Sequence, residues 1–202
     1  MLLIWSTFWL TYFIMGSLFY HDHFSLSKMV ITTRTLLNNI SVNALTTLLL
    51  SLMTYLLPYM QMALPKTFIG YGLHVLFALI VGDLCSYGTH RLLHTHSFYH
   101  YHKIHHQYIV PHSLVGVYSH PLEMAFNYIA ILIGLTSTSS YNDYTLMLET
   151  VVVAMGILLS HRANVNLWID AGAKMHNLHH QHLNCNYGFT MIVDWLFGTL
   201  QL

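Results

Sequence analysis

The chain has 202 residues, of which 55% are hydrophobic and only 7% are charged, and its formal net charge is zero. Soluble domains carry about 25% charged residues, so this composition excludes a soluble globular domain, a disordered chain and a nucleic-acid-binding protein. Two cysteines without CxxC spacing exclude a disulfide scaffold. Histidine is the exception, because its 17 residues outnumber all the acids and bases together. The composition therefore indicates an integral membrane protein that is rich in imidazole.

Three almost uncharged segments dominate the first part of the chain. They run over Met1–Tyr20, Val42–Leu64 and Phe68–Gly88, the last interrupted only by Asp83. Each is close to the roughly 20 residues that cross a hydrocarbon core. We therefore predict that residues 1–82 form mainly membrane anchor helices.

Two shorter apolar stretches follow, Ala125–Thr136 and Leu146–Ser160, with a small polar loop between them. Each is short for a vertical crossing, so they predict a tilted helical hairpin that dips into the bilayer, with two closely packed spans as the alternative. We predict an all-α fold in a single membrane domain, residues 1–202. Residues 83–202 would form the second region of this domain, which includes the hairpin and a histidine-rich helical cap over the membrane helices.

The basic residues predict the orientation of these segments. Six of the seven Lys and Arg follow the first segment, the third segment or the hairpin, and placing them in the cytosol leaves only Lys66 on the far side. Both histidine-rich regions then face the same compartment, which allows them to meet.

The histidines recur at matched spacings. Three boxes read H-x3-H, H-x2-HH and H-x2-HH, and their members are His90 and His94, then His102, His105 and His106, then His176, His179 and His180. Helix positions i, i+3 and i+4 share one face, so each box presents its imidazoles together. Imidazole binds Zn, Cu, Fe and Ni, and eight such ligands are too many for one tetrahedral zinc. The spacing therefore predicts two metal ions with open coordination positions.

The scarce acidic residues limit the kind of metal site. None of the boxes contains Asp or Glu, which is unlike a carboxylate-bridged di-iron bundle, and without HExxH a zinc hydrolase lacks its general base. Asp83, two helical turns before His90, either orients a ligating imidazole or is an acid at a helix end. Glu149, in the last apolar stretch, is either a functional residue or part of the hairpin turn.

The boxes and the residues around them resemble the membrane fatty acid hydroxylase/sterol desaturase superfamily. The resemblance runs from about Asp83 to Leu200 and rests on HR-x2-H from His90, Y-x2-HK-x-HH from Tyr99, and NYG followed by D-x-x-FGT near the end. The segment from His120 to Glu123, HPLE, is similar to one in C-4 sterol methyl oxidases. The third box differs from the frequent HD-x-HH pattern, because Asn177 stands where the acid is usual.

The resemblance implies a non-haem di-iron monooxygenase of the endoplasmic reticulum membrane, with its histidine boxes facing the cytosol. It implies two iron ions, which zinc can replace on purification, O2 as co-substrate, and a cytochrome b5-type or NADPH-linked electron donor. It assigns catalysis and metal ligation to the eight box histidines. A ninth ligand maps onto His161, with His120 as the competing residue.

For the reaction, the resemblance implies hydroxylation, oxidative demethylation or desaturation of a lipid. A sterol C-4 methyl group is the preferred substrate, and a fatty acyl or ceramide chain is the alternative. A non-catalytic metal-binding membrane protein is the alternative from another class. A metal transporter would place its ligands at mid-bilayer, whereas these boxes lie outside the apolar segments.

Overall fold

The computed structural model describes residues 6–7, 9–12, 14–15, 37–38, 40–41, 67–137, 143–161 and 171–202, without the side chains of 114, 131–132, 135–136 and 143–150. Within these ranges the chain is all-helical and has no strand, as predicted. The predicted segments Met1–Tyr20 and Val42–Leu64 lie largely or wholly outside the described residues.

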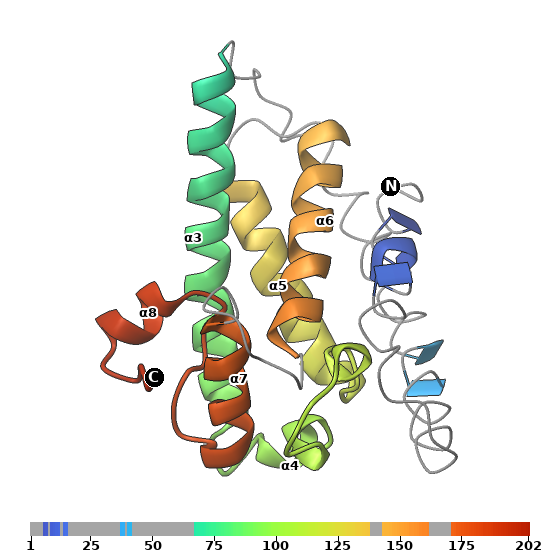
Figure 1. Ribbon diagram of the computed structural model, residues 1–202, viewed down its shortest axis with the longest axis vertical. Coiled ribbons are helices and arrows are strands. Elements are labelled where there is room, and N and C mark those ends of the chain that lie inside the picture. Colours follow the sequence, from blue (N-terminus) through green and yellow to red (C-terminus); the bar gives the residue numbers. More distant parts are fainter. Residues whose placement is uncertain are drawn as a thin grey trace.

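Six α-helices and two 3-10 turns make up the described part of the chain (Figure 1). In chain order they are α3 (Phe68–Leu93), α4 (Tyr99–His102), η3 (His105–Gln107), η4 (Ser113–Val115), α5 (Pro121–Ser137), α6 (Asp143–Ser160), α7 (Ala171–His182) and α8 (Met191–Leu196). The long helices α3, α5 and α6 run side by side, and α4 and α7 lie at one end of them (Figure 1). This end corresponds to the predicted histidine-rich cap.

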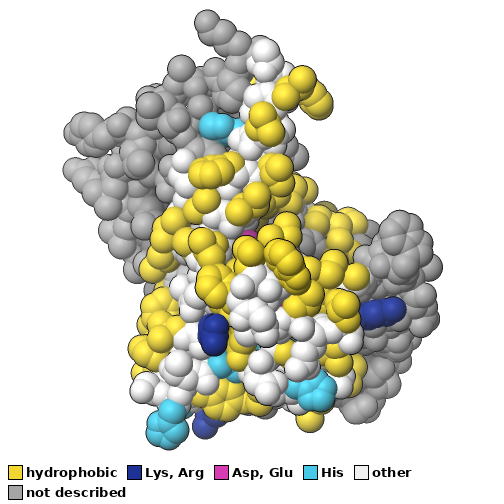
Figure 2. All heavy atoms as spheres, turned by 90° about the vertical axis from the view of Figure 1, so that its left-hand side faces the viewer, with side chains coloured by type: hydrophobic (Ala, Val, Ile, Leu, Met, Phe, Trp, Pro, Cys, Tyr) yellow, Lys and Arg dark blue, Asp and Glu magenta, His cyan; other side chains and the backbone are white. Residues whose placement is uncertain are grey.

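Helix α3 is the one described helix that is long and apolar enough to cross a membrane. The Thr67 hydroxyl caps its start by accepting a hydrogen bond from the Gly70 N–H at 3.1 Å. Its side chains point outward along most of its length, and the exposed ones include Phe68, Ile69, Leu73, Leu76, Phe77, Ile80 and Leu84. Figure 2 shows this face, where hydrophobic side chains cover the upper part and the Lys and Arg side chains lie lower down. The apolar face has the character expected of a surface in contact with lipid.

Helix α3 continues beyond the apolar segment. That segment ends near Gly88, whereas the helix runs to Leu93 with His94 as its C-cap, so Asp83 and His90 lie on one helix as predicted. Gly88 lowers helix propensity without breaking a helix, so the chain carries His90 out of the apolar stretch on a rigid element.

Helices α3 and α5 approach closely at two glycines. A Cβ on Gly134 would lie 2.7 Å from the Ala78 carbonyl oxygen and 2.8 Å from the Gly82 Cα, both of which are backbone atoms. The contact brings the start of α5 beside the end of α3, where the site lies.

Adding a methyl group at this crossing is expected to be destabilising. Gly134→Ala forces the two backbones apart, and overpacking of this kind costs about 1–3 kcal/mol. Gly72→Ala is the matched control, because a Cβ there meets nothing within 4 Å and alanine favours the helix. Thermal unfolding in detergent should show a lower Tm for Gly134→Ala alone, and equal Tm values for both variants would contradict the close crossing.

Polar residues near the N-terminus pack against the segment between η4 and α5. The Tyr12 hydroxyl donates to the Ser113 carbonyl at 3.0 Å and accepts from the Val117 N–H at 3.2 Å. The Asn38 side-chain amide bonds both the carbonyl and the N–H of Ser119. These bonds satisfy buried backbone groups where the chain has no regular structure.

Candidate metal centre

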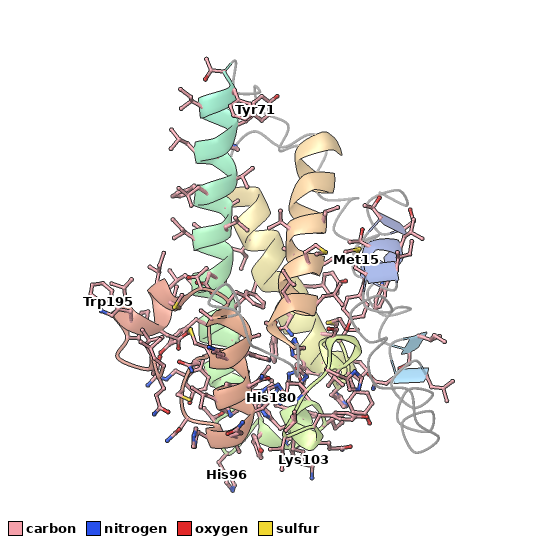
Figure 3. All side chains as sticks on the ribbon, in the orientation of Figure 1. Met15, Tyr71, His96, Lys103, His180 and Trp195 are labelled. Atoms are coloured by element: carbon pink, nitrogen blue, oxygen red, sulfur yellow. The ribbon has the colours of Figure 1, made fainter. Side chains whose placement is uncertain are left out.

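Nine histidine side chains converge in the cap and form two adjoining groups. The first group contains His90, His94, His102, His106 and His179, and the second contains His105, His161, His176 and His180. Within each group one ring nitrogen of every member lies within 4.8 Å of the others. Figure 3 shows His180 among the inward side chains, whereas His96 and Lys103 project from the outer end. The structure thus brings together all the histidines that the sequence predicted as ligands.

Both histidines of the H-x3-H box belong to the first group, whereas each H-x2-HH box divides its histidines between the two groups in the same way. The i, i+4 pairs stay together, so His102 and His106 join the first group and His176 and His180 join the second. The inner histidine of each H-x2-HH box crosses over, with His105 in the second group and His179 in the first. The two groups therefore share two of their supporting elements and form one unit.

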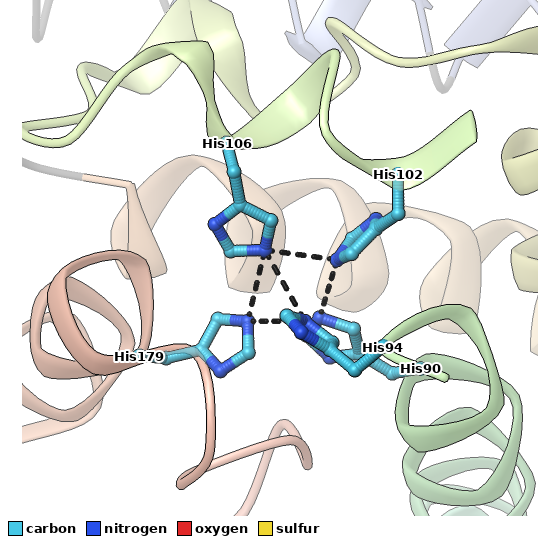
Figure 4. A group of neighbouring side chains, drawn as sticks. All are labelled: His90, His94, His102, His106 and His179. Atoms are coloured by element: carbon cyan, nitrogen blue, oxygen red, sulfur yellow. Dashed lines mark hydrogen bonds between the residues drawn. The ribbon is translucent and has the colours of Figure 1, made fainter. Parts of the chain in front are cut away.

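Three separate elements supply the first group (Figure 4). His90 and His94 come from the end of α3, His102 and His106 from the segment that contains α4 and η3, and His179 from α7. The prediction that each box lies on a single helix is correct for α7 but wrong for the second box, because α4 ends at His102 and a turn separates it from η3.

The Nε2 atoms face one another at short range. In the first group the Nε2–Nε2 distances are 2.9 Å from His102 to His106 and 3.2 Å from His94 to His179. In the second group they are 2.8 Å from His161 to His176 and 3.1 Å from His176 to His180.

The other ring nitrogen of most of these histidines is held by the backbone. The Nδ1 atoms of five members bond to carbonyl oxygens, namely His90 to Tyr187 at 2.7 Å, His179 to Cys185 at 2.6 Å, His180 to Tyr108 at 2.9 Å, His161 to Ile157 at 2.7 Å and His105 to Tyr118 at 3.3 Å. A carbonyl oxygen only accepts, so Nδ1 carries the proton and Nε2 keeps a free lone pair in each neutral ring.

These tautomers mean that some Nε2 pairs cannot be hydrogen bonds. His105 and His161 face each other at 3.4 Å, and both have their proton on Nδ1. Two lone pairs at this distance repel unless a cation lies between them. Around a metal with bonds of about 2.0–2.1 Å, neighbouring nitrogens are about 2.9–3.4 Å apart, which matches the separations observed. The donor set therefore fits a metal ion in each group.

Burial keeps these imidazoles in the neutral form that binds metals. Desolvation, and then the neighbouring imidazoles His161 and His90, lower the pKa of His180 to about 3. The same two causes lower the pKa of His105 and of His176 well below the usual 6.5. Each ring is therefore neutral at neutral pH and carries a single proton, which lies on Nδ1 in the five rings that bond to carbonyl oxygens and leaves their Nε2 atoms free for a metal ion.

Glu123, at the start of α5, contacts one member of the first group. Its Oε2 lies 3.0 Å from His102 Nδ1, and both side chains are buried. Burial raises the pKa of the Glu123 carboxyl well above its usual range, and the two facing atoms make no hydrogen bond in this geometry. A cation bound at His102 Nε2 would favour the ionised carboxylate, which would then orient the ring and raise the basicity of Nε2. Sequence reasoning noted Glu123 only as part of the HPLE segment, since nothing in the sequence places residues 102 and 123 side by side.

Two further acids hold the loop that follows α7. Asp194 accepts hydrogen bonds from the N–H groups of Tyr187 and Gly188, each at 2.8 Å. Asp83 accepts from the Phe189 N–H at 2.6 Å and from the Thr190 hydroxyl. The loop in turn presents the Tyr187 carbonyl to His90.

Both alternatives for Asp83 are therefore wrong. Asp83 neither orients a ligating imidazole directly nor stands as a free acid at a helix end, because its carboxylate is bonded to the loop after α7. Its effect on His90 passes through the Tyr187 carbonyl. The side chain of Glu149 lies outside the described residues.

The two residues considered for the ninth ligand occupy different positions. His161 follows α6 and belongs to the second group, with its Nε2 2.8 Å from that of His176. His120 lies outside both groups, and its Nδ1 accepts a hydrogen bond from the Leu122 N–H at 3.1 Å near the start of α5. The geometry places His161, and not His120, where a ligand is needed.

A small cavity of about 70 Å³ adjoins both groups. His90 and His102 line it on the side of the first group, and His105, His161 and His176 on the side of the second. Its remaining wall is mainly apolar and includes Leu93, Val117, Met124, Tyr128 and Ile157. A small molecule in this space would reach both groups at once and would be shielded from water.

Comparison with known proteins agrees with this site. The family model described as Fatty acid hydroxylase matches residues 75–199, which include all nine histidines. The chain belongs to the fatty acid hydroxylase family. The matched residues run from α3 to the loop after α8. They include both histidine groups and the three acids Asp83, Glu123 and Asp194.

The relatives of this fatty acid hydroxylase family member include an aldehyde decarbonylase and a sterol monooxygenase. Very-long-chain aldehyde decarbonylase GL1-8 of Oryza sativa subsp. indica is 34% identical over 136 residues, and Methylsterol monooxygenase 2-2 of Arabidopsis thaliana is 32% identical over 136 residues. Each alignment covers 62% of this chain and 51% of the relative. The chain thus spans about half the length of the curated relatives it matches. No solved structure matches the chain.

Proposed function

We propose that this protein is a membrane-bound, O2-dependent di-iron oxygenase that oxidises a C–H bond of a lipid. The observation that carries the proposal is the pair of adjoining all-imidazole groups, whose Nε2 lone pairs converge on two points. Membership of the fatty acid hydroxylase family supports the oxidative chemistry. Two iron ions, when bound, would supply the redox chemistry that directs O2 against an unactivated C–H bond.

The residues of this chain have three tasks in such a reaction. The nine imidazoles hold the two metals side by side, with the ring orientations fixed by backbone carbonyls and by Glu123. The apolar wall of the 70 Å³ cavity excludes water, which protects a reactive site from side reactions. The loop held by Asp83 and Asp194 closes the cavity with Tyr187 and Phe189.

Hydroxylation balances only with an external reductant. One C–H bond and one O2 give a C–OH group and one water, and this consumes two electrons and two protons. We propose a cytochrome b5-type or NADPH-linked donor for the electrons. We also propose that the protein lies in the endoplasmic reticulum membrane with its histidine groups facing the cytosol, which the distribution of Lys and Arg supports.

The methyl groups at C-4 of a sterol are the first substrate to test. The segment from His120 to Glu123 and the similarity to Methylsterol monooxygenase 2-2 support a sterol. A long-chain fatty acyl or ceramide substrate is the second candidate, because an aldehyde decarbonylase described as very-long-chain is equally similar to this chain.

The test is expression in a host that lacks sterol C-4 oxidation, followed by lipid profiling. The proposal predicts that 4-methyl sterols are consumed, or that oxidised acyl chains accumulate if the second candidate is correct. The host expressing a His179→Ala variant is the control, since this variant removes a member of the first group. If sterols and acyl chains are both unchanged while the protein is metal-loaded, the chain is a non-catalytic metal-binding protein.

A further inference from the structure

A second cavity, of about 250 Å³, lies between α3 and α6. Its wall on α3 includes Ala78, Gly82 and Ser86, and its wall on α6 includes Val152, Gly156 and Ser160. On each helix these positions are four residues apart, so they form a stripe along the helix axis. With a rise of about 1.5 Å per residue, the stripe on α3 extends over about 12 Å. The cavity is therefore elongated along the two helices.

The lining of this cavity is mainly apolar, and the buried Ser86 hydroxyl, which makes no hydrogen bond, lies on the wall that the cavity shares with the smaller one. Ala78, Leu79, Val152 and Val153 make most of the wall apolar. The carboxylate of Asp83, which also lines the cavity, is already bonded to Phe189 N–H and to Thr190. Burying a polar or charged group here without a partner is unfavourable, whereas burying hydrocarbon is favourable. The occupant that fits is an apolar hydrocarbon group.

The cavity adjoins the smaller cavity beside the candidate metal centre. Ser86 and Phe189 line both this cavity and the 70 Å³ cavity that adjoins the two histidine groups, so they form the wall between the two. Phe189 belongs to the loop that Asp83 and Asp194 hold in place. A hydrocarbon group that fills the larger space would thus end at this shared wall, on the side of it away from the histidines.

Gly156 lines the larger cavity where α6 is exposed. A Cβ on Gly156 would meet nothing within 4 Å, so a side chain at this position would not disturb the packing of α6. A side chain as large as leucine has the reach to occupy part of the cavity.

We propose that the cavity between α3 and α6 binds the hydrocarbon portion of the lipid substrate and holds it against the wall of Ser86 and Phe189 that separates it from the smaller cavity beside the two histidine groups. Gly156 determines how much of the hydrocarbon portion fits. The proposal rests on the proposed function, and it deepens that function by giving the substrate a binding site. The hydrocarbon is either a fatty chain or part of a sterol.

The test is photo-crosslinking of the full-length protein in detergent with two probes. One is a long-chain fatty alcohol with a diazirine in mid-chain, and the other is a sterol with a diazirine in its side chain. We expect at least one probe to label peptides that contain residues 78–86 or 152–160, and the probe that does so identifies the source of the hydrocarbon. Labelling confined to other peptides would overturn the proposal.

A pair of glycine variants makes the test specific. Gly156→Leu should reduce labelling by about tenfold or more, because each CH2 group excluded from the cavity is worth about fourfold in affinity. Gly72→Leu on α3 is the matched control, since a Cβ there also meets nothing within 4 Å and Gly72 does not line the cavity. Undiminished labelling of Gly156→Leu would refute the proposal.

Product formation, measured on the same samples, separates this proposal from the proposed function. Full activity of Gly156→Leu together with undiminished labelling would support the proposed function. The same result would show that the cavity does not bind the substrate. Labelling of the wild-type cavity without any oxidised product would refute the proposed function. It would still support the cavity as a binding site for hydrocarbon.

Discussion

Replacing His105 with alanine is expected to abolish product formation and to release one of the two metal ions. His105 is one of four members of the second group, and its Nε2 lies 3.4 Å from that of His161. Three imidazoles remain, and the affinity for the metal should fall by more than the roughly 10–100-fold seen when a partner of a ligand is removed. Metal analysis of the purified variant and lipid profiling of its host measure the two effects.

His182→Ala is the matched control for this variant. His182 lies on α7 beside the third box, but its side chain is exposed and it belongs to neither group. The control should keep both metals and full activity. Activity that survives in His105→Ala would show that the ligand assignment is wrong, and equal losses in the two variants would point to a general effect of removing histidine.

Replacing Glu123 with glutamine is expected to lower the affinity of the first group for its metal by about 10–100-fold. Glutamine keeps the shape of the side chain, but it lacks the negative charge that the carboxylate places 3.0 Å from His102 Nδ1. A neutral amide is also easier to bury than a carboxylate, so the metal-free variant should be at least as stable as the metal-free wild type.

The comparison of two measurements tests the role of Glu123. A metal titration gives the affinity of each site, and thermal unfolding without metal gives the stability. The account predicts weaker metal binding with an unchanged or higher Tm. A lower Tm with unchanged metal affinity would mean that Glu123 supports the fold and not the metal.

The ligating histidines could be predicted from the sequence because their signal is local. The spacing within each box is a property of neighbouring residues, and all eight box histidines lie in the two groups. The distribution between groups could not be predicted in this way. It depends on tertiary packing, because the i+3 histidine of each H-x2-HH box joins the other group whether the box is interrupted, as between α4 and η3, or lies on one helix, as in α7.

The roles of Asp83 and Glu123 could not be predicted either, because they depend on contacts between distant parts of the chain. The sequence left Asp83 with two roles, and the structure gives it a third, because the loop it binds lies more than 100 residues further along the chain. The contact between Glu123 and His102 could not be predicted from the sequence, because it depends on how α5 packs against α4. The resemblance favoured His161 over His120 as the ninth ligand, and the structure places His161 in the second group and His120 outside both groups.

Metal stoichiometry combined with X-ray absorption at the iron edge tests the central claim most directly. The protein, purified with iron, should hold two ions per chain, each surrounded by nitrogen and oxygen ligands without sulfur, because both groups are built from imidazole. One ion per chain, or sulfur in the coordination shell of either ion, would contradict the assignment of nine histidines to two adjoining metal sites.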